Sequence, residues 1–151
     1  MPDTKIPNPI LSAGEINALL DKIFPQISRG GSRSFTCEAV GPLSGRMRLH
    51  YHERHLRPGG TISGPAMFGL ADVALYATIL AHIGPVALAV TTNMSINFLR
   101  KPGPGDLIAT CRLLKLGRRL AVGEVTMCSE GSSEIAAHVT GTYSIPPRTA
   151  A

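Results

Sequence analysis

The sequence has no tryptophan, and aromatic residues make up only 5% of its 151 residues. Proteins that bind single-stranded nucleic acid stack bases on aromatic side chains, so this composition does not indicate that function. The net charge of +5 permits an anionic partner, but the 15 basic residues are spread along the chain and form no nucleic-acid footprint. A smaller anionic ligand is equally compatible with this charge.

Cysteines are also few, and Cys37, Cys111 and Cys128 lie far apart among apolar or strand-forming residues. An odd number at such spacing indicates reduced thiols in a cytoplasmic protein, not a disulfide or zinc framework. The histidines lack the spacing of a metal site, so we expect no metal. The N-terminus has no basic segment followed by an apolar run, so we expect no secretory signal.

The most informative stretch is residues 63–82, which is almost wholly apolar. Ser63 is a good helix N-cap, Gly64 permits close approach of another group, and Pro65 suits the first helical turn. Apolar side chains then fall on nearly every face, a pattern typical of a helix buried on all sides. The charged residues within the stretch and the Gly-Pro pair that follows it argue against a membrane span.

Asp72 is the one carboxylate in this predicted helix. An ionised carboxylate among apolar side chains is costly unless it is paired, hydrogen-bonded or facing a wet cleft. Two interpretations remain open at this point. Asp72 either ties the helix to a neighbouring strand, or it lies in a cleft and takes a proton from a water molecule.

The length predicts one main domain with short additions at both ends. A short amphipathic helix begins at Ser12, where Glu15 completes a capping box, and ends near Phe24 because Pro25 follows. We divide the chain into an N-terminal lead with this helix (1–33), the main α+β domain (34–146) and a tail (147–151).

Alternating apolar and polar residues separated by Gly- and Pro-containing turns predict a series of strands. The predicted strands are 34–40 and 46–51, which form a hairpin, and then 86–99, 107–116, 120–129 and 134–145. Their even spacing favours an antiparallel meander whose buried face packs on the apolar helix.

Residues 55–72, HLRPGGTISGPAMFGLAD, resemble the signature of acyl-CoA thioesterases of the phenylacetic-acid-degradation type. In that family a small loop, usually His-Gly-Gly, precedes a helix that carries Leu-Ala-Asp. The resemblance continues through residues 91–102, TTNMSINFLRKP, and through the Gly105-Asp106 turn, Gly117-Arg118-Arg119 and the closing strand to Tyr143. It implies the hotdog fold, in which a curled antiparallel sheet wraps a long central helix.

The resemblance also implies an activity, the hydrolysis of an acyl-CoA thioester at a dimer interface. Asp72 is expected to act as general base or nucleophile. The Gly64 N–H is expected to be the single oxyanion donor, since Pro65 has no N–H to offer. The expected partners are the acyl-CoA substrate and further copies of the chain, in a homodimer or a dimer of dimers (a homotetramer). No cofactor is expected besides the coenzyme A of the substrate.

Further residues correspond by the resemblance to positions that bind coenzyme A or assist the attacking water. They are Ser63, Thr91, Asn93, Arg100, Lys101, Gly117, Arg118 and Arg119. Each has an alternative interpretation. The basic residues are ordinary at strand ends and turns, Thr91 and Asn93 are expected to share the polar face of an edge strand, and Ser63 is explained by its role as N-cap.

The loop before the helix departs from the family pattern, with Ser63 where the family often has His and Pro65 where it has the second Gly. Arg57 lies near the place of another polar residue of the family. A protein that binds an acyl-CoA or acyl carrier without hydrolysing it is therefore the alternative. A hotdog dehydratase is a weaker hypothesis, because no His is paired with an acid in the usual helix and loop positions. Met47, Met67 and Phe68 could line an acyl pocket, but they do not show whether the acyl group is aromatic or aliphatic, or short or long.

Overall fold

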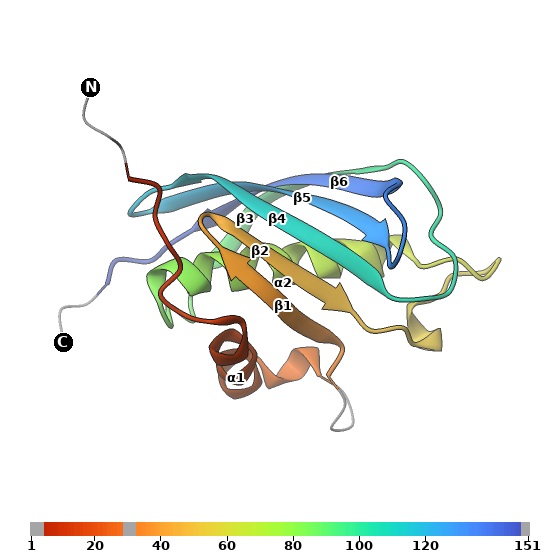
Figure 1. Ribbon diagram of the computed structural model, residues 1–151, viewed down its shortest axis with the longest axis horizontal. Helices are drawn as coiled ribbons and strands as arrows, with labels where there is room; N and C mark the ends of the chain where they lie inside the picture. The colour runs from red at the N-terminus through yellow and green to blue at the C-terminus, as the bar shows by residue number, and fades with distance from the viewer. Residues whose placement is uncertain (1–4, 29–32, 149–151) are drawn as a thin grey trace.

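The computed structural model describes residues 5–28 and 33–148, and it confirms the predicted α+β hotdog fold (Figure 1). Two α-helices and six strands make up most of it, with two short 3₁₀ turns. In chain order these are α1 (Ala13–Ile23), η1 (Pro25–Ile27), β1 (Phe35–Gly41), β2 (Ser44–Leu49), η2 (Glu53–His55), α2 (Gly64–Ile83), β3 (Val90–Phe98), β4 (Leu107–Leu116), β5 (Leu120–Ser129) and β6 (Ile135–Ser144).

The six strands form one antiparallel sheet in the order β1-β2-β4-β5-β6-β3. The hairpin β1-β2 and the meander β4-β5-β6 are as predicted. The prediction for the third strand is wrong in two respects: β3 begins at Val90, not at Val86, and it pairs with β6 at the far edge of the sheet. In the chain α2 follows β2 and precedes β3. The helix lies across the sheet, and it thereby carries the chain from β2 to the far edge where β3 begins (Figure 1).

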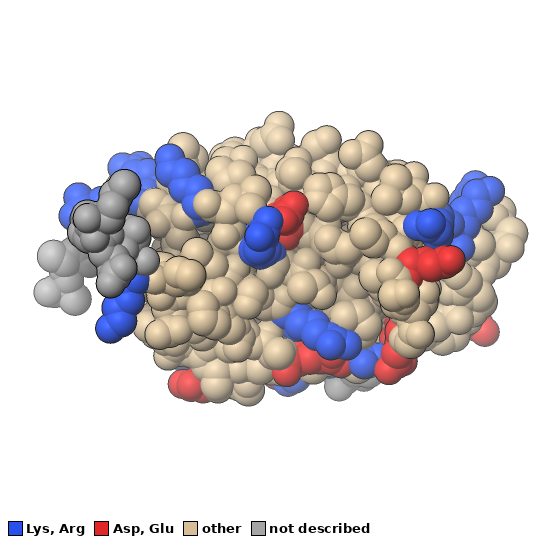
Figure 2. All heavy atoms as spheres, turned by 45° about the horizontal axis from the view of Figure 1, so that its top comes forward, with Lys and Arg blue, Asp and Glu red and all other residues tan. Residues whose placement is uncertain are grey.

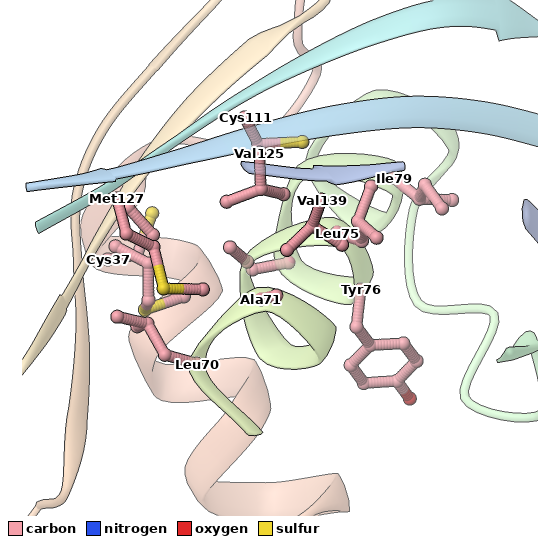
Figure 3. Packing of buried hydrophobic residues seen from close by; sticks show 14 of the residues in the cluster. Cys37, Leu70, Ala71, Leu75, Tyr76, Ile79, Cys111, Val125, Met127 and Val139 are labelled. Carbon is pink, nitrogen blue, oxygen red and sulfur yellow. The ribbon is translucent and has the colours of Figure 1, made fainter. Parts of the chain in front are cut away.

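The core lies between α2 and the face of the sheet that curls around it. Val125, Met127 and Val139 extend from the strands toward Leu75 and its neighbours on the helix (Figure 3). Two glycines of the sheet allow the close approach. A Cβ at Gly123 or Gly141 would come within 2.7 and 2.6 Å, respectively, of a Leu75 methyl carbon, so α2 fits against the strands only because these side chains are absent.

The two halves of α2 differ in burial, so the prediction of a helix buried on all sides is only half right. Residues 74–82 are all buried. The first half of the helix carries a stripe of partly or fully exposed residues, which are Pro65, Phe68, Gly69, Asp72 and Val73. Helical spacing places these residues on one face, and the sheet covers the opposite one. About two thirds of the apolar window of α2 (67%) is buried, so it is the core helix of the fold and not a membrane span.

The N-terminal helix covers one edge of the sheet. Its capping box of Ser12 and Glu15 and its end at Phe24 are as predicted. The side chain of Asn17 bonds both backbone groups of Cys37 in β1, at 2.9 and 2.8 Å, as a neighbouring strand would. Some of the backbone hydrogen-bonding groups at the β1 edge are therefore paired. At the opposite edge, β3 pairs with β6 on one side and with no strand of the described chain on the other.

Candidate active site

The Asp72 carboxylate is held by two hydroxyl groups from neighbouring strands. Thr91 in β3 and Tyr143 in β6 both donate hydrogen bonds to its Oδ1 atom, each at 2.5 Å. Thr91 and Tyr143 are directly opposite each other in the β3-β6 register, so both hydroxyls reach α2 from one place in the sheet. Within the described residues these bonds engage Oδ1 only, which leaves Oδ2 available for a water molecule.

A bulge in β3 brings Thr91 to Asp72. The register of β3 against β6 shifts between Thr91 and Asn93, so Thr91 lies on the helix side together with Met94, whose methyl approaches Gly141 on the core face. Asn93 pairs with Thr142 and is exposed. The predicted grouping of Thr91 with Asn93 on one face is therefore wrong, because simple alternation does not hold across a bulge.

Tyr143 is the site residue that the sequence did not indicate. Burial raises the pKa of its phenol well above the ordinary value, and the adjacent negative charge of Asp72 raises it further. Tyr143 therefore stays protonated and acts as a hydrogen-bond donor. Its oxygen also lies 3.0 Å from the Asp72 carbonyl oxygen, which fixes the phenol against the helix backbone.

Asp72 opens into a small pocket of about 170 Å³. Thr91 and Tyr143 line it beside Asp72, and the rest of the wall is largely apolar. The lining residues are Phe24, Ile27, Asp72, Val73, Tyr76, Ala87, Ala89, Val90, Thr91 and Tyr143. Asp72 is the one charged side chain among these described lining residues. A carboxylate beside an apolar pocket suits acid-base chemistry on an apolar substrate.

Gly64 lies at the other end of the exposed stripe of α2. The Ser63 hydroxyl accepts a hydrogen bond from the Ala66 N–H at 3.2 Å, which confirms its interpretation as N-cap. A Cβ at Gly64 would lie 3.3 Å from the Phe98 ring, so this residue is next to the end of β3. Gly64 and Asp72 are eight positions apart, or about 12 Å of helix rise, so one chain does not bring both to the same atom.

The predicted basic residues fall into two separate groups. Arg100 and Lys101 follow the end of β3, where Arg100 bonds the Ile135 carbonyl oxygen at 2.7 Å. Arg118 and Arg119 lie in the β4-β5 turn, at the end of the sheet nearer Asp72. In the view of Figure 2, basic side chains lie at both ends of the molecule and in its middle, and those in the middle and at the right lie beside acidic ones.

The β4-β5 turn borders a hollow of about 680 Å³ that holds a third arginine, Arg148. The Gly117 N–H donates to the Leu120 carbonyl and closes the turn, and the Arg119 guanidinium bonds the Ile145 carbonyl oxygen at 3.1 Å. None of the three arginines forms an ion pair with a described acid. The hollow is therefore suited to an anion. Among the described residues, no group of three or more His, Cys, Asp or Glu side chains could hold a metal ion.

Comparison with known proteins identifies the family. The family model "Thioesterase superfamily" matches residues 59–136, which include the whole of α2, the strands β3, β4 and β5, and the first two residues of β6. The chain belongs to the thioesterase superfamily. The prediction of a thioester hydrolase is thereby confirmed at the level of the family.

Similar proteins extend this match to almost the whole chain. A provisionally assigned thioesterase from a Silicibacter species is 50% identical, with a TM-score of 0.84 over 95% of this chain and 97% of that one. The phenylacetic acid degradation protein PaaI of Thermus thermophilus is 26% identical, with a TM-score of 0.65 over 75% and 94%. A provisionally assigned esterase of Saccharolobus solfataricus is 29% identical over 89% of this chain and 86% of its own.

Proposed function

We propose that this thioesterase-superfamily protein hydrolyses acyl-CoA thioesters, with Asp72 of one chain and the Gly64 N–H of a second chain acting on the same thioester. The observation that carries the proposal is the Asp72 carboxylate, fixed by Thr91 and Tyr143 at the wall of an apolar pocket. A carboxylate that only tied α2 to the sheet would not need to line a pocket.

The position of Gly64 supports a site shared between two chains. Asp72 contacts the beginning of β3 through Thr91, and Gly64 lies beside Phe98 at its end. Two copies of β3 that pair antiparallel about a two-fold axis would set the beginning of one strand against the end of the other. Gly64 of one copy would then approach Asp72 of the other.

The exposed side chains of this region fit such a pairing. Phe68 is 39% exposed on the stripe of α2 between Gly64 and Asp72, and Val90 and Phe98 are 57% and 53% exposed on β3. Large apolar side chains around a free strand edge are typical of a surface that another chain covers. We propose a homodimer formed through β3, alone or as the unit of a dimer of dimers.

The chemistry follows from these groups. Asp72 Oδ2 accepts a proton from a water molecule, and the water oxygen attacks the thioester carbonyl carbon. The helix N-terminus at Gly64 donates an N–H to the oxyanion that develops. When the tetrahedral intermediate collapses, the C–S bond breaks and the protonated Asp72 returns its proton to the thiolate. The products are the free acid and coenzyme A, and the reaction uses no metal or redox cofactor.

The basic residues are the proposed contacts for the phosphates of coenzyme A. Arg118 and Arg119, next to the Gly117 turn, border the open hollow at the Asp72 end of the sheet. In the proposed dimer, Arg100 and Lys101 of the second chain would come toward the same end, because the two β3 strands run in opposite directions. Ser63 and Asn93 are proposed to border the path of the pantetheine arm from the second chain.

Replacement of Asp72 by Asn tests this proposal. Release of free thiol from a panel of aliphatic and aromatic acyl-CoAs is expected to fall at least about 1,000-fold, because the base is removed while shape is kept. The matched control is Asp21→Asn, the same change at an exposed site on α1. Wild-type turnover in Asp72→Asn would contradict the proposal, and saturable binding without thiol release by the wild-type protein would favour the non-catalytic alternative.

A further inference from the structure

One wall of the Asp72 pocket comes from the N-terminal part of the chain. Phe24 and Ile27 line the pocket, yet both lie outside residues 59–136, the part that the family model matches. The residues that perform the proposed chemistry all belong to α2 and the sheet. The N-terminal element therefore contributes shape, not reactive groups, to the pocket.

Phe24 is held firmly in this wall. Its N–H donates to the Leu20 carbonyl at 2.8 Å as the C-cap of α1, and its own carbonyl accepts from the Ile27 N–H at 3.3 Å. The helix behind it is anchored by the fully buried Ile16. The Phe24 ring lies 6.1 Å from the Tyr76 ring, centroid to centroid, and the side chain is 40% exposed. A fixed ring with an open face suits a wall that an apolar ligand touches.

The wall of the pocket has a polar part and an apolar part. Asp72 and its two hydroxyl donors form the polar part. Beside them Tyr76 stacks on Tyr143 and donates its hydroxyl proton to the Ala87 carbonyl at 2.7 Å, and Figure 3 shows its ring extending from α2 away from the labelled core residues. A thioester whose carbonyl lies at Asp72 would thus direct an uncharged, apolar acyl group toward Tyr76 and Phe24.

The volume of the pocket matches that of a short acyl group. Its volume is about 170 Å³, and a protein cavity of roughly 150 Å³ accommodates one benzene molecule, or six carbon atoms. We propose that Phe24, supported by Ile27, is the specificity-determining stop that restricts the acyl group to about six carbon atoms. This inference rests on the proposed hydrolysis of acyl-CoA and adds to it the chain-length limit and the residue that sets it.

Two substitutions at Phe24 move the limit in opposite directions. Phe24→Ala opens the wall, and it is expected to raise the ratio of kcat/KM for decanoyl-CoA to that for hexanoyl-CoA about tenfold or more. Phe24→Trp narrows the pocket, and it is expected to lower the ratio of kcat/KM for hexanoyl-CoA to that for butanoyl-CoA. Each ratio compares two substrates of one enzyme preparation, so a loss of stability alone does not change it. Ile10→Ala, an exposed apolar residue outside the pocket lining, is the matched control.

The outcomes separate this inference from the proposed function. Opposite shifts with Ala and Trp, and none with the control, support Phe24 as the stop. Turnover of acyl-CoAs with the same chain-length profile in all variants overturns this inference alone. If the wild-type protein releases no thiol from any of these acyl-CoAs, the proposed hydrolysis fails, and the inference that rests on it fails as well.

Discussion

The Tyr143 hydroxyl in β6 donates a hydrogen bond to the Asp72 carboxylate in α2 across 2.5 Å, and these two residues are 71 positions apart in the chain. The bond joins the last strand of the sheet to the central helix. It also aims the carboxylate, because Thr91 donates to the same oxygen from the opposing strand position. The orientation of the proposed base is therefore set by the sheet and not by the helix that carries it.

Replacement of Tyr143 by Phe removes this hydrogen bond and keeps the ring. The kcat/KM for acyl-CoA hydrolysis is expected to fall about 10- to 100-fold, because a carboxylate with one donor left is less well positioned for its water molecule. Steady-state kinetics by thiol release measures the change. Tyr51→Phe is the control, since Tyr51 is exposed and lies outside the pocket lining. An equal loss of activity in both variants would show that Tyr143 has no specific relation to Asp72.

The buried cysteines provide a second prediction, on reactivity. Burial raises the pKa of Cys37 to about 11 and that of Cys111 to about 12, so at pH 8 neither forms an appreciable amount of thiolate. A disulfide reagent such as DTNB is expected to modify at most the half-buried Cys128 in the native protein, and all three thiols in guanidinium chloride. Rapid modification of more than one thiol in the native protein would contradict the packing of β1 or β4.

A third prediction concerns stability in acid. Burial alone would raise the pKa of Asp106, but hydrogen bonds from the Tyr51 N–H at 2.7 Å and from Arg48 at 2.9 Å outweigh it and lower the pKa below the ordinary value. Because the pKa is lower in the folded state, Asp106 stabilises the fold above its unfolded-state pKa of about 3.9, and this stabilisation is lost as the pH falls through the folded-state value.

Asp106→Asn is therefore expected to reduce the free energy of unfolding at pH 7 by about 1–3 kcal/mol. The difference from the wild-type protein should shrink below about pH 4. Urea denaturation at pH 7 and pH 3 measures both values. The control is Glu134→Gln, whose contact with Arg100 is long and exposed and should matter little. A difference that stays constant between the two pH values would show that the Asp106 charge is not the cause.

Local patterns were sufficient to predict most of the fold. The end of α1 follows from Pro25, and the alternation and turn residues of β4 and β5 give bounds that match the structure. The place of β3 was not predictable in this way. The path of α2 across the sheet determines that β3 pairs with β6. The bulge that turns Thr91 toward the helix cannot be detected from a simple alternation of apolar and polar residues.

The candidate site was predictable in part for the same reason. Asp72 was identified because a lone carboxylate in an apolar helix requires an explanation. Tyr143 and Phe24 were missed, since each resembles an ordinary aromatic residue until the contact with a distant segment is known. The open stripe of α2 could not be predicted either, because the extent of the sheet decides which face of the helix stays uncovered.

In the proposed enzyme two chains share one site, and a mixed dimer tests this sharing most directly. Gly64→Pro removes the proposed oxyanion donor at a position where a helix tolerates proline, and Gly64→Ala, which keeps the N–H, is its control. Homodimers of Asp72→Asn and of Gly64→Pro should both be inactive. A heterodimer of these two variants, purified with two affinity tags, contains one complete site and is expected to recover about half of the wild-type rate of thiol release. A heterodimer as inactive as its parents would contradict the account.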